Sequence, residues 1–209
     1  MTLTALTLVG TDAALVDAWR VEFARYPSIT IVHDTIFNVD ADTLVSPANS
    51  FGVMDGGLDG KLRDFFGASI ERIVRQRIAG DFYGELPVGL ACLVETGHAR
   101  YRYLISAPTM RCPADVSRTI NAYLAMKALL NVAIGHEAPL HVAVPGLCAL
   151  TGRMSAPMVA RQMRIAYERA VLGRHRYSHW REEREFERYI LGEVPDPPQE
   201  LAAVHRSQR

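Results

Sequence analysis

The chain has 209 residues, a length that predicts one domain with at most a short appendage. Hydrophobic residues make up 49% and charged residues 22% of it, which excludes a disordered or membrane-embedded class. Lys plus Arg and Asp plus Glu both total 23, so no basic excess indicates a nucleic acid partner. An anionic ligand would therefore depend on local main-chain N–H groups and helix N-termini.

The three cysteines, Cys92, Cys112 and Cys148, are an odd set without CxxC spacing. This argues against a disulfide framework or a zinc site and favours a reducing compartment. Met1 to Gly10 lacks a positively charged leader, and no apolar window reaches the length of a membrane helix. We therefore expect a cytoplasmic protein that contacts no membrane and needs no metal or cofactor.

Strands and helices are expected to alternate along the first half of the chain. A strand at Leu3–Val9 precedes a helix that Thr11 or Asp12 can cap, since its apolar residues recur at helical spacing. Short apolar runs between polar turns predict two strands buried on both faces. These strands are Ile29–Val32 and Thr43–Val45, and two helices follow at Leu58–Phe66 and Ser69–Ile78, separated near Gly67.

The second half predicts a hairpin, two more core helices and a peripheral one. The hairpin is Val88–Val94 with Tyr101–Ser106, and a long helix capped by Asp115 runs from there to Ile134. A strand follows at His141–Val144, and Ser155 caps the next helix, which has Pro157 in its first turn. The charged Arg174–Leu191 segment should dock through Trp180, Phe186, Tyr189 and Ile190. Together these elements predict an α/β protein, a three-layer α/β/α sandwich with a mixed central sheet over residues 1–173. Residues 174–209 would be a helical extension and tail packed on that domain.

The Pro47–Gly60 loop joins a buried strand to a helix and contains four glycines. Glycine lets a diphosphate approach the main chain, and the helix dipole favours anions. The plainer alternative is a structural glycine-rich turn. A chemical alternative is a small serine hydrolase, because Ser50 in Ala48–Gly52 approaches a nucleophile elbow, with Asp115 and His136 or His141 as partners. The residues between Ser50 and the helix disfavour that alternative, since an elbow turns directly into its helix.

The same loop resembles the first ligand loop of macrodomains, in which N-A-A-N is followed by a run of glycines and V-D-G before a helix. Counted without a gap from Asn49, the glycine run falls on Met54–Gly57 and V-D-G falls on Leu58–Gly60. Asp34-Thr35-Ile36 resembles the family's G-D-I-T turn, Leu90–Pro108 its hairpin, and Val142–Pro145 the strand before its second loop. The resemblance spans Leu3 to Val171 and is greatest to a bacterial and phage-associated subgroup. It implies recognition of ADP-ribose, as in the branch that processes ADP-ribose 1''-phosphate.

The resemblance also implies roles for residues in the first loop. Asp34, with Thr35 in the same turn, would contact the adenine, and Asn49 the distal ribose. Gly56 and Gly57, with Leu58, would approach that ribose and the phosphates. Asp59 would activate water in a hydrolytic member, beside an oxocarbenium-like transition state. The alternative for Asp59 is an acidic residue that only complements the helix dipole.

The second loop, Gly146–Met154, departs from the family's Thr-Gly-x-Gly pattern, and two registers stay open. Either Thr151-Gly152 is the Thr-Gly pair and the loop is slightly long, or Gly152 is the second glycine and Ala149 and Leu150 replace Thr-Gly. In the second register Arg153 could compensate by reaching a phosphate. The expected ligand contacts here are Gly146, Thr151, Gly152, Arg153 and Met154.

The leading hypothesis is a macrodomain that binds ADP-ribose and hydrolyses an ADP-ribosyl linkage or a related derivative, with Asn49 and Asp59 as catalytic residues. The expected partner is ADP-ribose or an ADP-ribosylated substrate. A non-catalytic ADP-ribose binding module is the alternative. We expect Cys148 to be a packed thiol, and His175 and His179 to be surface residues despite a spacing that can bind metals.

Overall fold

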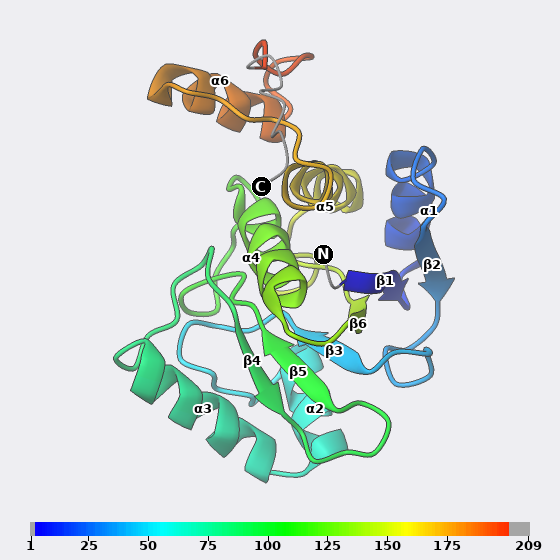
Figure 1. The fold of residues 1–209 in the computed structure, drawn as a ribbon, viewed down its shortest axis with the longest axis vertical. Coiled ribbons are helices and arrows are strands. Elements are labelled where there is room, and N and C mark those ends of the chain that lie inside the picture. The colour runs from blue at the N-terminus through cyan, green and yellow to red at the C-terminus, as the bar shows by residue number, and fades with distance from the viewer. Residues whose placement is uncertain (1–2, 201–209) are drawn as a thin grey trace.

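The structure is a computed structural model that describes residues 3–200, and its centre is one six-stranded sheet. The strand order is β2-β1-β6-β3-β5-β4, and every neighbouring pair is parallel except β4 with β5 (Figure 1). The strands are β1 (Leu3–Gly10), β2 (Ile29–His33), β3 (Thr43–Ser46), β4 (Cys92–Glu95), β5 (Tyr103–Ser106) and β6 (Leu140–Val144). The predicted mixed sheet is confirmed.

Helices cover both faces of this sheet. They are α1 (Ala13–Glu22), α2 (Gly57–Phe66), α3 (Ser69–Asp81), α4 (Asn121–Gly135), α5 (Ala156–Ala170) and α6 (Trp180–Ile190). One core cluster joins α1, α4 and α5 to inward residues such as Leu8 and Val142, and a second joins α2 and α3 to Leu44 and Leu104. Because side chains alternate across a strand, the two clusters lie on opposite faces, which gives the predicted three layers.

The last helix, α6, lies outside the three layers and packs against α5 (Figure 1). Phe186, Tyr189 and Ile190 are buried in the same core cluster as α5, which confirms three of the four expected docking residues. The prediction for Trp180 is wrong, because it begins the helix on the outer side and is 62% exposed. Residues 201–209 of the expected tail lie outside the described part of the chain.

Several predicted boundaries differ from the observed ones for identifiable reasons. The long helix begins at Asn121, because Val116 N donates to Gly152 O (3.0 Å) and holds the preceding segment against the second loop. Asp115 caps only a local turn there, accepting from Ser117 N at 2.9 Å. Asp12 caps α1 as expected, accepting from Ala14 N at 3.0 Å, whereas Ser155 precedes α5 without a side-chain cap bond.

Five parallel strands place the loops of interest at one edge of the sheet. The Asp34 turn follows β2, the Pro47–Gly56 loop follows β3, and the Gly146–Met154 loop follows β6. Since parallel strands end on the same side, the three segments named from the sequence share the carboxyl edge. Among the described residues, no helix combines the length and apolar character needed to cross a bilayer.

Candidate functional site

Asn49 holds the first loop together through its side chain. Its Oδ1 accepts from Phe51 N at 3.0 Å and Val53 N at 3.3 Å, and its Nδ2 donates to Val53 O at 2.7 Å. Gly52 has φ +65°, and a Cβ there would come within 2.9 Å of Val74 and Ile78. The turn after Asn49 is therefore fixed by hydrogen bonds on one side and by α3 on the other.

Gly56 and Gly57 lie at the start of α2 with open space beside them. Gly56 is the N-cap residue with extended backbone (φ −160°), and Gly57 has φ +57°. Both are exposed, and no heavy atom lies within 4 Å of the place a Cβ would occupy on either residue. The first N–H groups of a helix have no partner within it, so this turn presents donors and a positive dipole end to solvent.

Asp59 lies in the first turn of α2 but is only 9% exposed. Its Oδ1 accepts a 2.5 Å hydrogen bond from Ser46 Oγ at the end of β3. Burial raises the pKa of Asp59 to about 6; the Ser46 hydrogen bond opposes the rise, and the charge of Asp55 adds to it. The result is a desolvated carboxyl group that titrates near neutrality, two residues after the open glycine turn.

The Asp34 turn is exposed and internally hydrogen-bonded. Asp34 Oδ1 accepts from Thr35 N at 2.6 Å and from Asn38 Nδ2 at 3.0 Å. His33, which precedes Asp34, has its Nε2 3.1 Å from Thr11 O. The turn is thus tied to the end of β1 as well as to β2.

The second loop divides into buried and exposed residues. A Cβ on Gly152 would lie 2.6 Å from the main-chain oxygen of Cys148, so the packing requires glycine there. A Cβ on Gly146 would lie 2.4 Å from the end of the Leu15 side chain, which would have to move. Thr151 and Arg153 are exposed, and Arg153 has φ +55°. The Met154 side chain lies in the core, and its N–H donates to Cys148 O at 3.0 Å.

The residues considered for serine, thiol or metal chemistry are not arranged for it. Ser50 is 1% exposed, and its Oγ is buried without a hydrogen-bond partner among the described residues. Burial raises the pKa of the Cys148 thiol to about 12, so it stays protonated and unreactive. His179 caps α6 through a bond from Arg181 N, whereas His175 is buried against Glu168 at 2.9 Å, contrary to the expected surface position.

Two cavities in the described structure lie away from these loops. One of about 720 Å³ lies between α4, α5 and α6 and is lined by Tyr123, Lys127, Arg169 and Phe186, among others. The other, of about 630 Å³, runs along β4 between α3 and the end of α4. Neither includes the Pro47–Gly60 loop.

The sequence interpretation missed Ser46 and Asp55, the two polar neighbours of Asp59. Ser46 ends a strand in which all four residues are buried, and a hydroxyl at the carboxyl end of a buried strand is a usable signal for a polar site. Asp55 carried no such signal, because acidic residues beside glycine are common in ordinary turns.

Comparison with known proteins identifies the class. Residues 45–163 match the family described as Macro domain, and this protein belongs to that family. A protein of Aquifex aeolicus is 35% identical over 135 residues, covering 65% of this chain and 78% of its own length. One of Aeropyrum pernix is 35% identical over 129 residues, covering 61% and 64%.

Solved macrodomains share the fold. The macrodomain of Mycobacterium tuberculosis DarG has a TM-score of 0.56 at 18% identity, covering 79% of this chain and 91% of its own. That of Thermus aquaticus DarG has a TM-score of 0.55 at 21% identity, covering 65% and 87%. A mutant of the Oceanobacillus iheyensis macrodomain, solved with ADPR, has a TM-score of 0.52 at 13% identity, covering 79% and 80%.

Proposed function

We propose that this protein binds ADP-ribose at the carboxyl edge of its sheet and hydrolyses an ADP-ribosyl linkage there. The observation that carries the proposal is the buried Asp59 carboxyl group, held by Ser46 beside the open Gly56–Gly57 turn. Macrodomains solved with ADPR and with ADP share this fold, which supports a nucleotide diphosphate as the ligand class. The diphosphate would lie against the N-terminus of α2, where main-chain N–H groups supply the charge complement.

The remaining predicted residues divide between different parts of the ligand. Asp34 and Thr35 would face the adenine, while Gly146, Thr151, Gly152, Arg153 and Met154 would line the phosphate side. Of that second group, the exposed Thr151 and Arg153 offer side chains, whereas Gly146, Gly152 and Met154 could contribute only through the main chain or by shaping the loop. Asn49 would act on the ribose by fixing the loop that faces it, since its amide is bonded within that loop. Leu58 would pack beside the ribose.

In the proposed hydrolysis, Asp59 is the general base. With a pKa of about 6 the carboxyl group is mostly ionised at pH 7 and still basic enough to accept a proton. The water oxygen forms a bond to the anomeric carbon, the leaving group departs with the electron pair of the broken bond, and the water proton passes to Asp59. The negative charge would also offset the positive charge of the oxocarbenium-like transition state.

The test separates catalysis from binding with an isosteric change. Titration calorimetry with ADP-ribose should give similar affinities for the native protein and Asp59→Asn, while hydrolysis of ADP-ribose 1''-phosphate and of a mono-ADP-ribosylated peptide should fall at least about a hundredfold in the variant. Equal turnover by both proteins would remove Asp59 from the mechanism.

The second candidate is a binding module without turnover. The hydrogen bond from Ser46 and the burial of Asp59 favour this candidate, because both are also expected of a carboxyl group with a purely structural role. A native protein that binds ADP-ribose but releases no product from either substrate would establish this candidate. A protein that does not bind ADP-ribose at all would refute both.

A further inference from the structure

The edge strand β4 has unused main-chain hydrogen-bonding groups. Thr96 N donates to Arg102 O across the antiparallel β4–β5 pair. Main-chain groups of alternate residues point the same way, so the N–H and C=O groups of Cys92 and Val94 also face β5. Tyr103 N donates to Asp42 O on the opposite side, so its partner Glu95 must face away from β5. The N–H and C=O groups of Leu93 and Glu95 therefore point outward, where the described sheet has no further strand.

This outward edge forms the floor of the cavity of about 630 Å³ described above. Its lining includes every residue from Ala91 to Glu95, so the cavity follows the strand along its length. Ile73 and Arg77 of α3 form one wall, and Val132 and Gly135 of α4 form the other. Figure 1 shows β4 at the edge of the sheet, between α3 and α4. Because these helices cover opposite faces of the sheet, the groove that their residues line lies between the two layers.

Apart from Arg77, which pairs with Asp81 at 2.9 Å, the wall residues named above carry no charge. Ile73 and Phe82 pack with the core under α3, and Val132 packs with the core under α4. A strand added beside β4 would alternate its side chains between these walls, so apolar residues at successive positions would be covered. The edge would supply hydrogen bonds and the walls would supply apolar contact, the combination by which sheets accept an added peptide strand.

We propose that the groove along β4 binds a short, extended, apolar peptide segment as an additional strand of the sheet. Residues of α3 and α4 line the groove on either side of β4, and this selects such a segment over a second copy of the chain. Two copies that paired their β4 edges would bring these helices towards each other, whereas a single extended segment needs only one strand spacing, about 4.8 Å. The groove is independent of the proposed ADP-ribose site.

The test uses a defined probe, an octapeptide blocked at both ends with Val-Ile-Val-Ile at its centre and two lysines on each side. Fluorescence polarisation with a labelled probe should show saturable binding to the full chain. Methylating all the central amides should abolish binding, because either edge of the probe would then have lost the N–H groups that pair with β4. Unchanged binding by the fully methylated probe, or no binding up to millimolar protein, would refute strand addition.

Two pairs of variants locate the site. Gly135→Phe should fill the groove and weaken binding of the probe at least about tenfold. Gly80→Phe is the control, because a Cβ at either glycine would have no heavy atom within 4 Å but only Gly135 lines the groove. Glu95→Pro removes the outward N–H group of this residue, and an edge strand tolerates proline there because the β4–β5 hydrogen bonds do not use that group. Glu95→Pro should therefore weaken the probe, whereas Glu95→Ala, which keeps the N–H group, should not. Circular dichroism and melting curves check that each variant folds.

Two outcomes would assign the groove differently. Unchanged binding by Gly135→Phe and Glu95→Pro would place the probe elsewhere and overturn the proposal. A native dimer in light scattering that Gly135→Phe converts to a monomer would identify the groove as an interface between copies. Supporting data would be slower hydrogen exchange at the Leu93 and Glu95 amides when the probe is bound.

Discussion

At the scale of single residues, the buried position of Asp59 lowers the stability of the folded protein when its carboxyl group is ionised. Its pKa is raised from 3.8 to about 6, so the folded state binds the proton more tightly than the unfolded state does. The stabilisation is complete below about pH 4 and is lost as the pH rises through about 6. Each pKa unit corresponds to about 1.4 kcal/mol, so above pH 7 the ionised carboxylate costs up to about 3 kcal/mol.

Replacing this carboxyl group should therefore stabilise the protein in a pH-dependent way. Denaturant titrations of Asp59→Asn should match the native protein near pH 4 and exceed its free energy of unfolding by about 2 kcal/mol at pH 8. Asp64→Asn is the control, because Asp64 lies on the same helix and its side chain is 77% exposed. A native protein as stable at pH 8 as Asp59→Asn would contradict the raised pKa.

Gly56 offers a second test at this scale, because a side chain there would block a ligand without straining the backbone. With φ near −160° and no neighbour within 4 Å, Gly56→Val should fold with a stability within about 0.5 kcal/mol of the native protein. The added side chain would occupy the space proposed for the ribose and phosphates, so calorimetry should show at least about a tenfold loss of ADP-ribose affinity. Unchanged affinity in the folded variant would move the ligand away from this turn.

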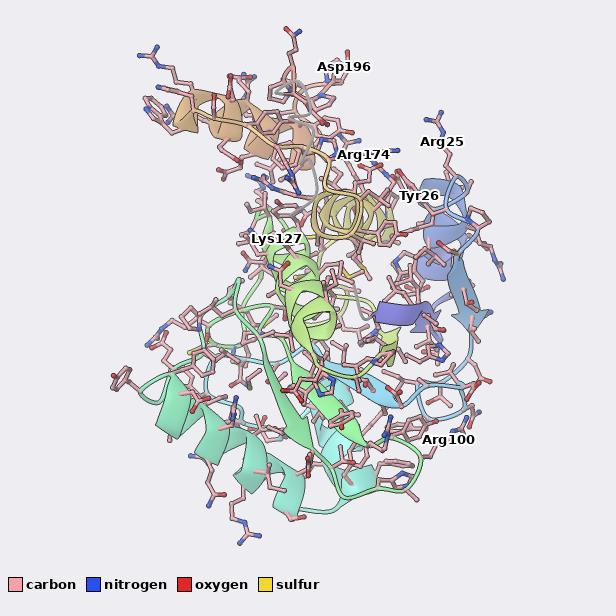
Figure 2. The ribbon with its side chains drawn as sticks, viewed as in Figure 1. Arg25, Tyr26, Arg100, Lys127, Arg174 and Asp196 are labelled. Carbon is pink, nitrogen blue, oxygen red and sulfur yellow. The ribbon has the colours of Figure 1, made fainter. Side chains whose placement is uncertain are left out.

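At the scale of elements, a buried charge network joins the C-terminal segment to α1 and α5. Glu168 on α5 accepts hydrogen bonds from Tyr26 and contacts Arg164 (2.8 Å) and His175 (2.9 Å). Arg174 reaches Tyr26 at 3.2 Å, and both residues lie on the α1 and α5 side of the molecule (Figure 2). Burial alone would raise the pKa of Glu168, but the bonds from His175 and Tyr26 and the charge of Arg164 lower it from 4.5 to about 2.

This network should resist acid down to the lowered pKa. The stability that Glu168 contributes is complete above about pH 4.5 and is lost as the pH falls towards 2. Glu168→Gln should unfold about 3 kcal/mol more easily at pH 7, and its stability should converge with that of the native protein near pH 2. Glu185→Gln, at an exposed position on α6, should change stability by less than about 0.5 kcal/mol. A constant difference between pH 7 and pH 2 for Glu168→Gln would contradict the assignment.

At the scale of the whole molecule, periodicity predicted the layers, and the order of the elements predicted that the loops of the proposed site share one edge of the sheet. Apolar runs identified the buried strands because both faces of each strand are covered, and the loop register from Asn49 to Asp59 needed no gap. The start of α4 was not predictable, because the bond from Val116 to Gly152 joins segments far apart in sequence. Trp180 failed as an anchor because hydrophobicity alone does not say which face of a helix meets the core.

The same limit applies to the site. Glycines and an acidic residue at a strand-to-helix junction were visible in the sequence, but the Ser46–Asp59 bond that buries the carboxyl group depends on how β3 and α2 pack. The inward position of His175 was also hidden, since its partner Glu168 belongs to another element. Contacts between elements, rather than the elements themselves, are what the sequence could not provide.

The C-terminal extension should be an integral part of the fold. Phe186 packs edge-on against Tyr123 of α4 (5.9 Å between ring centres), and Arg161 of α5 donates to Tyr189 O at 2.6 Å. Burying Phe186, Tyr189 and Ile190 stabilises the protein by about 1.5–3 kcal/mol for each side chain, which together approaches the whole stability of a typical domain. A chain ending at Gly173 should therefore be insoluble or only partly folded.

Point variants on α6 test this without truncation. Phe186→Ala should lower the free energy of unfolding by about 3–4 kcal/mol, because it leaves a cavity between α4, α5 and α6. Trp180→Ala on the same helix should lower it by less than about 1 kcal/mol, since that side chain is 62% exposed. A chain of residues 1–173 that is monomeric and melts cooperatively within a few degrees of the full chain would show instead that α6 is an appendage, and Phe186→Ala would then have little effect as well.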